Sequence, residues 1–92
     1  MEKLYREKRV RAIGVSNFLP HHMENLLSSC EVVPAVDQLE FHPGYSQEAA
    51  VCYCQERGIL VQAWSPLGRK RVMDDELVEE LAKAHHVTPA QI

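Results

Sequence analysis

Residues 10–18, VRAIGVSNF, begin as an apolar run rich in β-forming residues and stop abruptly at Ser16-Asn17-Phe18. The same pattern returns at Ala35–Leu39, which ends in Glu40-Phe41-His42-Pro43, and at Ile59–Ala63, which ends in Trp64-Ser65-Pro66-Leu67-Gly68. A helix-like stretch follows each run, and strands that are joined by crossover helices must be parallel. The sequence therefore predicts an α/β fold whose three polar strand ends share one edge of a parallel sheet. In such folds that carboxyl edge is where ligands are held.

Apolar residues at helical spacing predict the helices around these runs. The stripes are Met1-Leu4-Tyr5, Met23-Leu26-Leu27, Ala50-Tyr53-Cys54 and Leu77-Val78-Leu81. Pro20 suits the first turn of the second helix, and we expect Ser46 and Asp74 to cap the third and fourth. Gly58 is expected to end the third helix in the left-handed conformation.

Both ends of the sequence suggest a piece of a larger domain. Thr88-Pro89-Ala90-Gln91 combine a capping box with a proline at the first helical position, yet only Ile92 follows. The three runs are mostly apolar, as expected for strands buried on both faces. Three such strands would leave two unpaired edges and an uncovered face. We therefore expect residues 1–92 to be a fragment truncated at both ends, with exposed strand edges that drive self-association.

Composition excludes several classes of function. The chain is 46% apolar and 25% charged, as in ordinary globular proteins, and its net charge of −3 argues against nucleic-acid and membrane partners. No apolar stretch approaches the roughly 20 residues of a membrane span and no signal peptide is evident, so we expect a cytoplasmic protein. The three cysteines are expected to be buried and reduced. The adjacent histidines lack zinc-ligand spacing, and no metal site is expected.

Polar and aromatic side chains at the shared edge indicate what kind of ligand could bind there. Ser16 and Asn17 offer a hydroxyl and a carboxamide, Gln38 offers a second carboxamide, and Trp64 offers a flat aromatic face. This set suits a planar ring that bears a carboxamide, and residues 65–68 could receive phosphate oxygens. Each residue also has a structural reading: a Ser-Asn turn, a polar group on a strand face, or a core tryptophan. The sequence shows no acid–base pair and no glycine-rich phosphate loop.

Residues 10–18, 34–43 and 58–68 resemble, in order and spacing, three consecutive signatures of the aldo-keto reductases. The tryptophan and the short following loop are most similar to the bacterial 2,5-diketogluconate reductase-like branch. The resemblance implies a partial (β/α)8 TIM barrel, about three βα units that correspond to strands five to seven, and a cofactor NADPH (or NADH). It implies that Ser16, Asn17 and Gln38 grip the nicotinamide carboxamide, that Trp64 stacks on the ring, and that Ser65, Leu67 and Gly68 line the pyrophosphate.

The resemblance also implies a function for the complete protein. It would be an NAD(P)H-dependent oxidoreductase that reduces small aldehydes or ketones to alcohols. The family's catalytic Asp, Tyr, Lys and His precede the segment represented here, so no catalytic residue is assigned, His42 included, and the fragment alone is expected to be inactive. Arg69, Lys70 and Arg71 are interpreted as a solvated loop. The alternatives are a non-catalytic cofactor-binding barrel relative, similar to a channel β-subunit, and a non-functional truncated reading frame.

Overall fold

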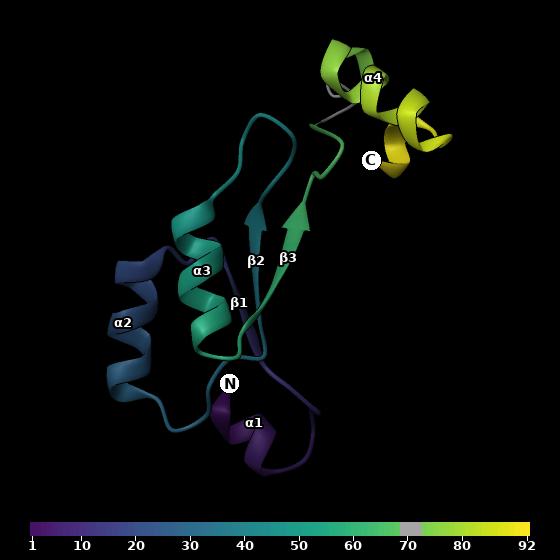
Figure 1. Cartoon of the computed structure of the whole chain (residues 1–92). Coiled ribbons are helices and arrows are strands. Elements are labelled where there is room, and N and C mark those ends of the chain that lie inside the picture. The colour runs from purple at the N-terminus through teal and green to yellow at the C-terminus, as the bar shows by residue number, and fades with distance from the viewer. Residues whose placement is uncertain (69–72) are drawn as a thin grey trace. The chain divides into compact units, whose positions relative to one another are not determined.

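A computed structural model describes residues 1–68 and 73–92 and contains one three-stranded sheet (Figure 1). The strands are β1 (Gly14–Ser16), β2 (Val36–Glu40) and β3 (Leu60–Trp64), in the spatial order β1-β2-β3. β1 runs parallel to β2, with Ser16 opposite Gln38, and the Leu60 N–H donates to the Ala35 carbonyl at 3.0 Å. The predicted parallel α/β sheet is confirmed.

The helices follow the predicted order. They are α1 (Glu2–Arg6), α2 (Pro20–Ser29), α3 (Glu48–Glu56), α4 (Glu76–His85) and the short 3-10 helix η2 (Pro89–Gln91). Pro20 occupies the first turn of α2, and Gly58, with φ of 70°, supplies the left-handed residue after α3. The Thr88 N–H donates to Gln91 Oε1 at 2.8 Å, which confirms the capping box before η2.

Several local details differ from the sequence prediction. β1 begins at Gly14 rather than near Val10, because its partner strand starts only after Pro34 and pairs from Val36 onward. Gln47 rather than Ser46 precedes α3. Asp75 rather than Asp74 caps α4, since its carboxylate accepts from the Leu77 and Val78 N–H groups at 2.9 and 3.2 Å.

The buried face of α4 agrees with the prediction only in part. Val78 and Ala82 are buried, whereas Leu77 is 62% exposed and Leu81 is 39% exposed. Of the predicted stripe Leu77-Val78-Leu81, Val78 is therefore buried as expected, and Ala82, about one turn further along the helix, is the second buried residue. Helical spacing placed Val78 correctly and did not identify Ala82.

The chain divides into two compact units, and the first contains the main apolar core. The first unit comprises residues 1–39 and 47–62, and the second comprises residues 40–46 and 63–92. In the first unit, α2 and α3 cover one face of the sheet (Figure 1), and Met23, Cys54 and Ile59 are buried there. On the other face Leu60 is 67% exposed. Within the described residues the sheet is therefore buried on one face, and the other is the uncovered face that was expected of three such strands.

The cysteines do not share one environment. Cys54 is buried, Cys30 is intermediate and Cys52 is exposed, so the prediction of three buried thiols was wrong for Cys52. A spacing of two residues on α3 places Cys52 and Cys54 on different sides of the helix, and only one side faces the sheet. Arg69, Lys70 and Arg71 lie outside the described residues. No helix in the described ranges has the length and apolar character needed to cross a membrane.

Candidate functional site

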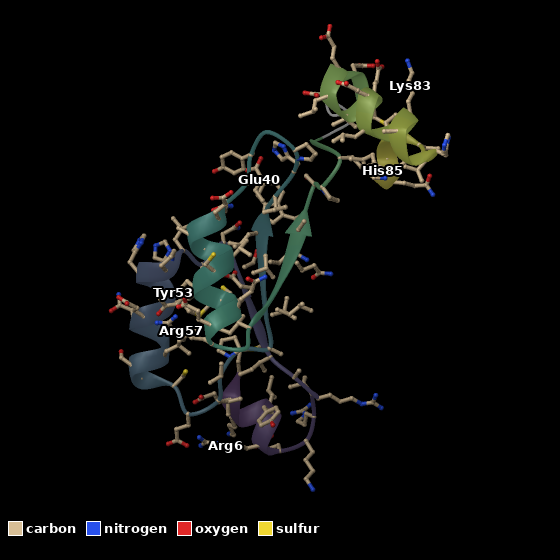
Figure 2. All side chains as sticks on the ribbon, viewed as in Figure 1. Arg6, Glu40, Tyr53, Arg57, Lys83 and His85 are labelled. Carbon is tan, nitrogen blue, oxygen red and sulfur yellow. The ribbon has the colours of Figure 1, made fainter. Side chains whose placement is uncertain are left out.

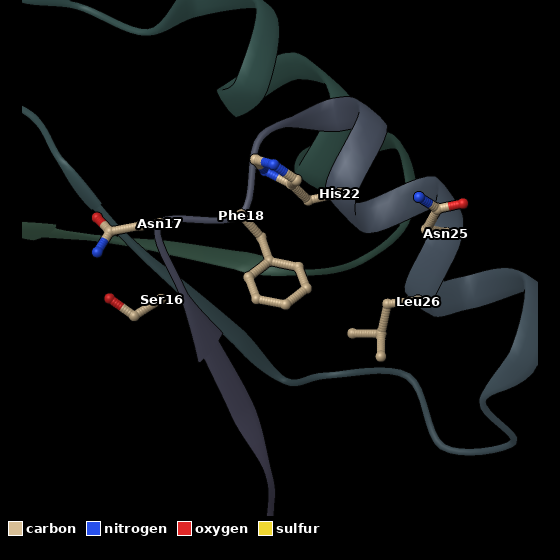
Figure 3. Close-up of a pocket in the computed structure, with 6 residues that line it drawn as sticks. All are labelled: Ser16, Asn17, Phe18, His22, Asn25 and Leu26. Atoms are coloured by element: carbon tan, nitrogen blue, oxygen red, sulfur yellow. The ribbon is translucent and has the colours of Figure 1, made fainter.

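The turn after β1 is fastened to the neighbouring strand by one carbonyl oxygen. The Gln38 carbonyl accepts the Ser16 hydroxyl at 3.0 Å and the Asn17 N–H at 2.9 Å. Asn17 has φ of 61°, a left-handed conformation that residues other than glycine seldom adopt and that asparagine tolerates best. Figure 3 shows the Ser16 and Asn17 side chains on one side of the turn, whereas Phe18 extends on the side of α2. The turn therefore presents a hydroxyl and a carboxamide together.

Gln38 adds a second carboxamide to the same part of the sheet. On the open face, Gln38 Nε2 donates to Gln62 Oε1 at 2.9 Å. This bond leaves Gln38 Oε1 as the atom suited to accept from a ligand amide, and Ser16 Oγ, which donates to a carbonyl, has lone pairs for the same purpose. The predicted trio of Ser16, Asn17 and Gln38 is thus brought together. Gln62 was not predicted, although its place two residues before Trp64 on the same strand was visible in the sequence.

Beneath the turn lies a buried carboxyl that the sequence reasoning missed. Asp37 is fully buried, and its Oδ1 accepts the Phe18 N–H at 3.4 Å. Its Oδ2 accepts the Cys54 thiol at 3.7 Å. Burial raises the pKa of Asp37, and burial together with the adjacent Asp37 carboxyl raises the pKa of Cys54. The available signal was an acidic residue inside the apolar run Ala35–Leu39.

An open pocket of about 510 Å³ adjoins this turn (Figure 3). It is lined by Ser16, Asn17, Phe18, His22, Asn25 and Leu26. His22 is held in place because its Nδ1 accepts the Leu19 N–H at 3.1 Å, and its ring lies edge-on to Phe18 with centroids 6.0 Å apart. No group of three or more His, Cys, Asp or Glu side chains in residues 1–68 and 73–92 could hold a metal ion.

The other predicted residues, Trp64, Ser65, Leu67 and Gly68, belong to the second unit. Ser65 is also left-handed, with φ of 49°, and its carbonyl accepts the Gly68 N–H at 2.8 Å. Because this N–H is used within the turn, the Ser65 hydroxyl and the Leu67 N–H are the better candidates to meet an anion. Leu67 lines a pocket of about 460 Å³ that also includes His42.

His42 is engaged in local contacts. Its Nε2 lies 3.2 Å from Glu40 Oε1, and its ring stacks on Tyr45 with centroids 5.6 Å apart. The antiparallel bridge between His42 and Tyr45 closes the loop after β2. These contacts agree with a structural position for this histidine.

The family model for the Aldo/keto reductase family matches residues 1–92. The chain belongs to the aldo/keto reductase family. Glyoxal reductase of Bacillus subtilis (strain 168) is 45% identical over 92 residues, which are 100% of this chain and 33% of that protein. The 9,11-endoperoxide prostaglandin H2 reductase of Trypanosoma cruzi (strain CL Brener) is 45% identical over 95 residues, 100% of this chain and 34% of that protein.

Solved structures agree with this family membership. A mutant of Gox0644 in complex with NADPH has a TM-score of 0.91 and 40% identity, covering 98% of this chain and 33% of that one. The aldose reductase from Schistosoma japonicum has a TM-score of 0.92 and 40% identity, covering 99% of this chain and 30% of that one. This aldo/keto reductase chain therefore spans about a third of the length of its relatives, and its fold is part of their parallel (β/α)8 TIM barrel.

Proposed function

We propose that this chain forms the nicotinamide-binding and pyrophosphate-binding part of the cofactor site of an NAD(P)H-dependent reductase of aldehydes and ketones. The observation that carries the proposal is the trio of Ser16, Asn17 and Gln38: the Ser16 hydroxyl and the Asn17 backbone N–H both donate to the Gln38 backbone carbonyl, and the Gln38 carboxamide donates to Gln62. A primary amide has one acceptor and two donor hydrogens, and two carboxamides with a hydroxyl can satisfy all of them. A mutant of Gox0644, a structural relative, is in complex with NADPH.

Each residue has a distinct role in this proposal. Ser16 Oγ and Gln38 Oε1 accept from the amide nitrogen of the nicotinamide, and the Asn17 carboxamide binds its carbonyl oxygen. Trp64 supplies the surface on which the ring stacks, and Ser65, Leu67 and Gly68 form the turn near the pyrophosphate. When bound, the nicotinamide supplies hydride to the substrate carbonyl. The chain's own residues orient the ring so that one face is available.

The remaining features of the complete enzyme belong to the same proposal. Small carbonyl compounds are the substrate class, the cofactor is NADPH or NADH, and the location is cytoplasmic. The groups that protonate the developing alkoxide are proposed to lie outside these 92 residues, which makes the isolated chain inactive.

A chimera tests the proposal. The matching third of the Bacillus subtilis glyoxal reductase is replaced by this chain, and NADPH binding and carbonyl-dependent NADPH oxidation are measured. Ser16→Ala, Asn17→Ala and Gln38→Ala should each weaken NADPH binding about tenfold, the equivalent of one or two hydrogen bonds. Gln55→Ala removes an exposed carboxamide from α3 and serves as the matched control.

Two results would count against the proposal. If the Ser16, Asn17 and Gln38 variants bind NADPH as tightly as the Gln55 control, these three residues do not bind the nicotinamide carboxamide. If the chimera binds NADPH normally but oxidises none of it with any carbonyl substrate, the segment serves a cofactor-binding protein that is not a reductase.

A further inference from the structure

Asp37 is a charged residue that the described part of the fold buries completely. An ionised carboxyl is costly to bury unless polar partners compensate, so a buried aspartate in a short strand needs an explanation. A hydrophobic residue at this position would fill the same space between the sheet and α3. The contacts of the carboxyl indicate what it provides instead.

The carboxyl joins the turn after β1 to α3. Asp37 Oδ1 accepts the Phe18 N–H at 3.4 Å, and Oδ2 accepts the Cys54 thiol at 3.7 Å. The register pairs Val15 with Asp37 and Ser16 with Gln38, so consecutive residues of β2 serve opposite faces of the sheet. Gln38 contributes to the open face, and Asp37 holds the same turn from the helix-covered face.

Asn17 lies between two of these anchors. Its own N–H donates to the Gln38 carbonyl at 2.9 Å, and the next N–H, that of Phe18, donates to Asp37. With both flanking amides fixed, the peptide planes around Asn17 are set and its left-handed φ of 61° is maintained. The direction of the Asn17 Cα–Cβ bond, from which the carboxamide extends, follows from those two planes.

Cys54 fixes Asp37 in turn. Cys54 is 2% exposed and packs with Met23 and Ile59. Its thiol is therefore held in place, and it can donate to Asp37 only when the carboxyl keeps its present rotamer. Arg57, which directly follows α3, lies beside Tyr53 (Figure 2). Its guanidinium carbon is 3.5 Å from the centroid of the Tyr53 ring, and the guanidinium donates to the Tyr53 carbonyl. The hydrogen bonds that reach the Asp37 carboxyl thus come from the turn and from Cys54.

We infer that Asp37 and Cys54 are positioning residues that hold the turn at Asn17 in the conformation required to grip a nicotinamide carboxamide. The identity of the gripped ligand rests on the proposed function. The positioning itself is a property of the chain without ligand.

The test compares Asp37→Ala, Asp37→Asn and Cys54→Ala in the full 92-residue chain. Amide hydrogen exchange at Phe18 reports the bond to Asp37, and exchange at Ile59, whose N–H donates to the Cys54 carbonyl at 2.9 Å, reports the core. Asp37→Ala should speed exchange at Phe18 about tenfold relative to Ile59. Asp37→Asn retains an oxygen acceptor and should restore most of the protection. Cys54→Ala keeps the Asp37 carboxyl but removes the thiol that holds it, so it should also speed exchange at Phe18. This variant tests the positioning role if Asp37→Ala fails to fold.

A second readout connects the pair to the ligand. If Asp37 positions the turn, binding of NADP⁺ and burial of Cys54 are coupled, and the coupling is reciprocal. NADP⁺ should slow alkylation of Cys54 and leave that of the exposed Cys52 unchanged. Asp37→Ala should weaken NADP⁺ binding about tenfold, and Asp37→Asn should stay within about threefold of the parent.

Three outcomes decide between the claims. Unchanged Phe18 exchange in both Asp37→Ala and Cys54→Ala overturns the positioning role. Equal acceleration of amide exchange at Phe18 and Ile59 would show that Asp37 and Cys54 contribute only to overall stability. This result would also overturn the positioning role. Failure of the chimera with the glyoxal reductase to bind NADP⁺, with the exchange pattern in the 92-residue chain as expected, refutes the proposed function and leaves the positioning role supported.

Discussion

Replacing Asn17 separates the backbone role of this residue from the role of its side chain. Asn17 has φ of 61°, where an alanine costs about 1–2 kcal/mol because its Cβ approaches the carbonyl oxygen. Glycine has no such penalty, and its greater freedom in the unfolded state costs about 0.5–1 kcal/mol. We therefore expect Asn17→Gly to have a free energy of unfolding within about 1 kcal/mol of the parent, and Asn17→Ala to lie about 1 kcal/mol below Asn17→Gly.

Nicotinamide binding should respond differently. Both variants lack the carboxamide, so both should lose one or two hydrogen bonds to the ligand, about 1–2 kcal/mol or roughly 5- to 30-fold in the dissociation constant. Urea denaturation measures the stability, and a titration of NADPH followed by fluorescence measures the affinity.

Lys8 provides a matched control, because its φ is 60° and it lies in the exposed turn after α1. Lys8→Gly should change stability in the same way as Asn17→Gly and leave NADPH binding unchanged. Equal destabilisation by glycine and alanine at residue 17 would refute the backbone argument. Parental affinity in Asn17→Gly would refute the role of the carboxamide.

Three further predictions concern the surroundings of the site. Gly14→Ala should cost about 1–3 kcal/mol in urea denaturation, because a Cβ there would lie 2.8 Å from the Val36 carbonyl oxygen and the strands must separate; parental stability would contradict it. Gln62→Ala frees the Gln38 amide and should weaken NADPH binding about threefold while changing stability by less than about 0.5 kcal/mol; a Gln55→Ala control should do neither. Glu2 accepts the Val32 and Glu31 N–H groups at 2.7 and 2.6 Å, which lower its pKa below the ordinary value of 4.5. Its stabilisation is therefore present above that value and lost as the pH falls through the folded-state pKa, so Glu2→Gln should flatten the acid limb of stability against pH; an unchanged limb would contradict the assignment.

The sequence was most informative where backbone constraints act locally. Pro34 cannot donate a hydrogen bond, so the strand had to begin after it, and Gly58 was needed where φ is positive. The grouping of Ser16 and Gln38 followed from parallel register alone, because the carboxyl ends of adjacent parallel strands meet.

Other details depend on packing, which a pattern does not contain. Asp74 and Asp75 are equally good caps by type, and the observed choice is Asp75. Asp37 reads as an interruption of an apolar run, and only the fold shows that it faces α3 and contacts Phe18.

The most direct test of the central claim is a titration of the ¹⁵N-labelled chain with NADPH, followed through the side-chain amide signals of Asn17, Gln38 and Gln55. Nuclear magnetic resonance detects millimolar binding, so weak binding by the 92-residue chain can be measured without an activity assay. The carboxamide grip predicts that the Asn17 and Gln38 signals shift together with one dissociation constant while the Gln55 signal stays in place. Stationary Asn17 and Gln38 signals at saturating NADPH would contradict it.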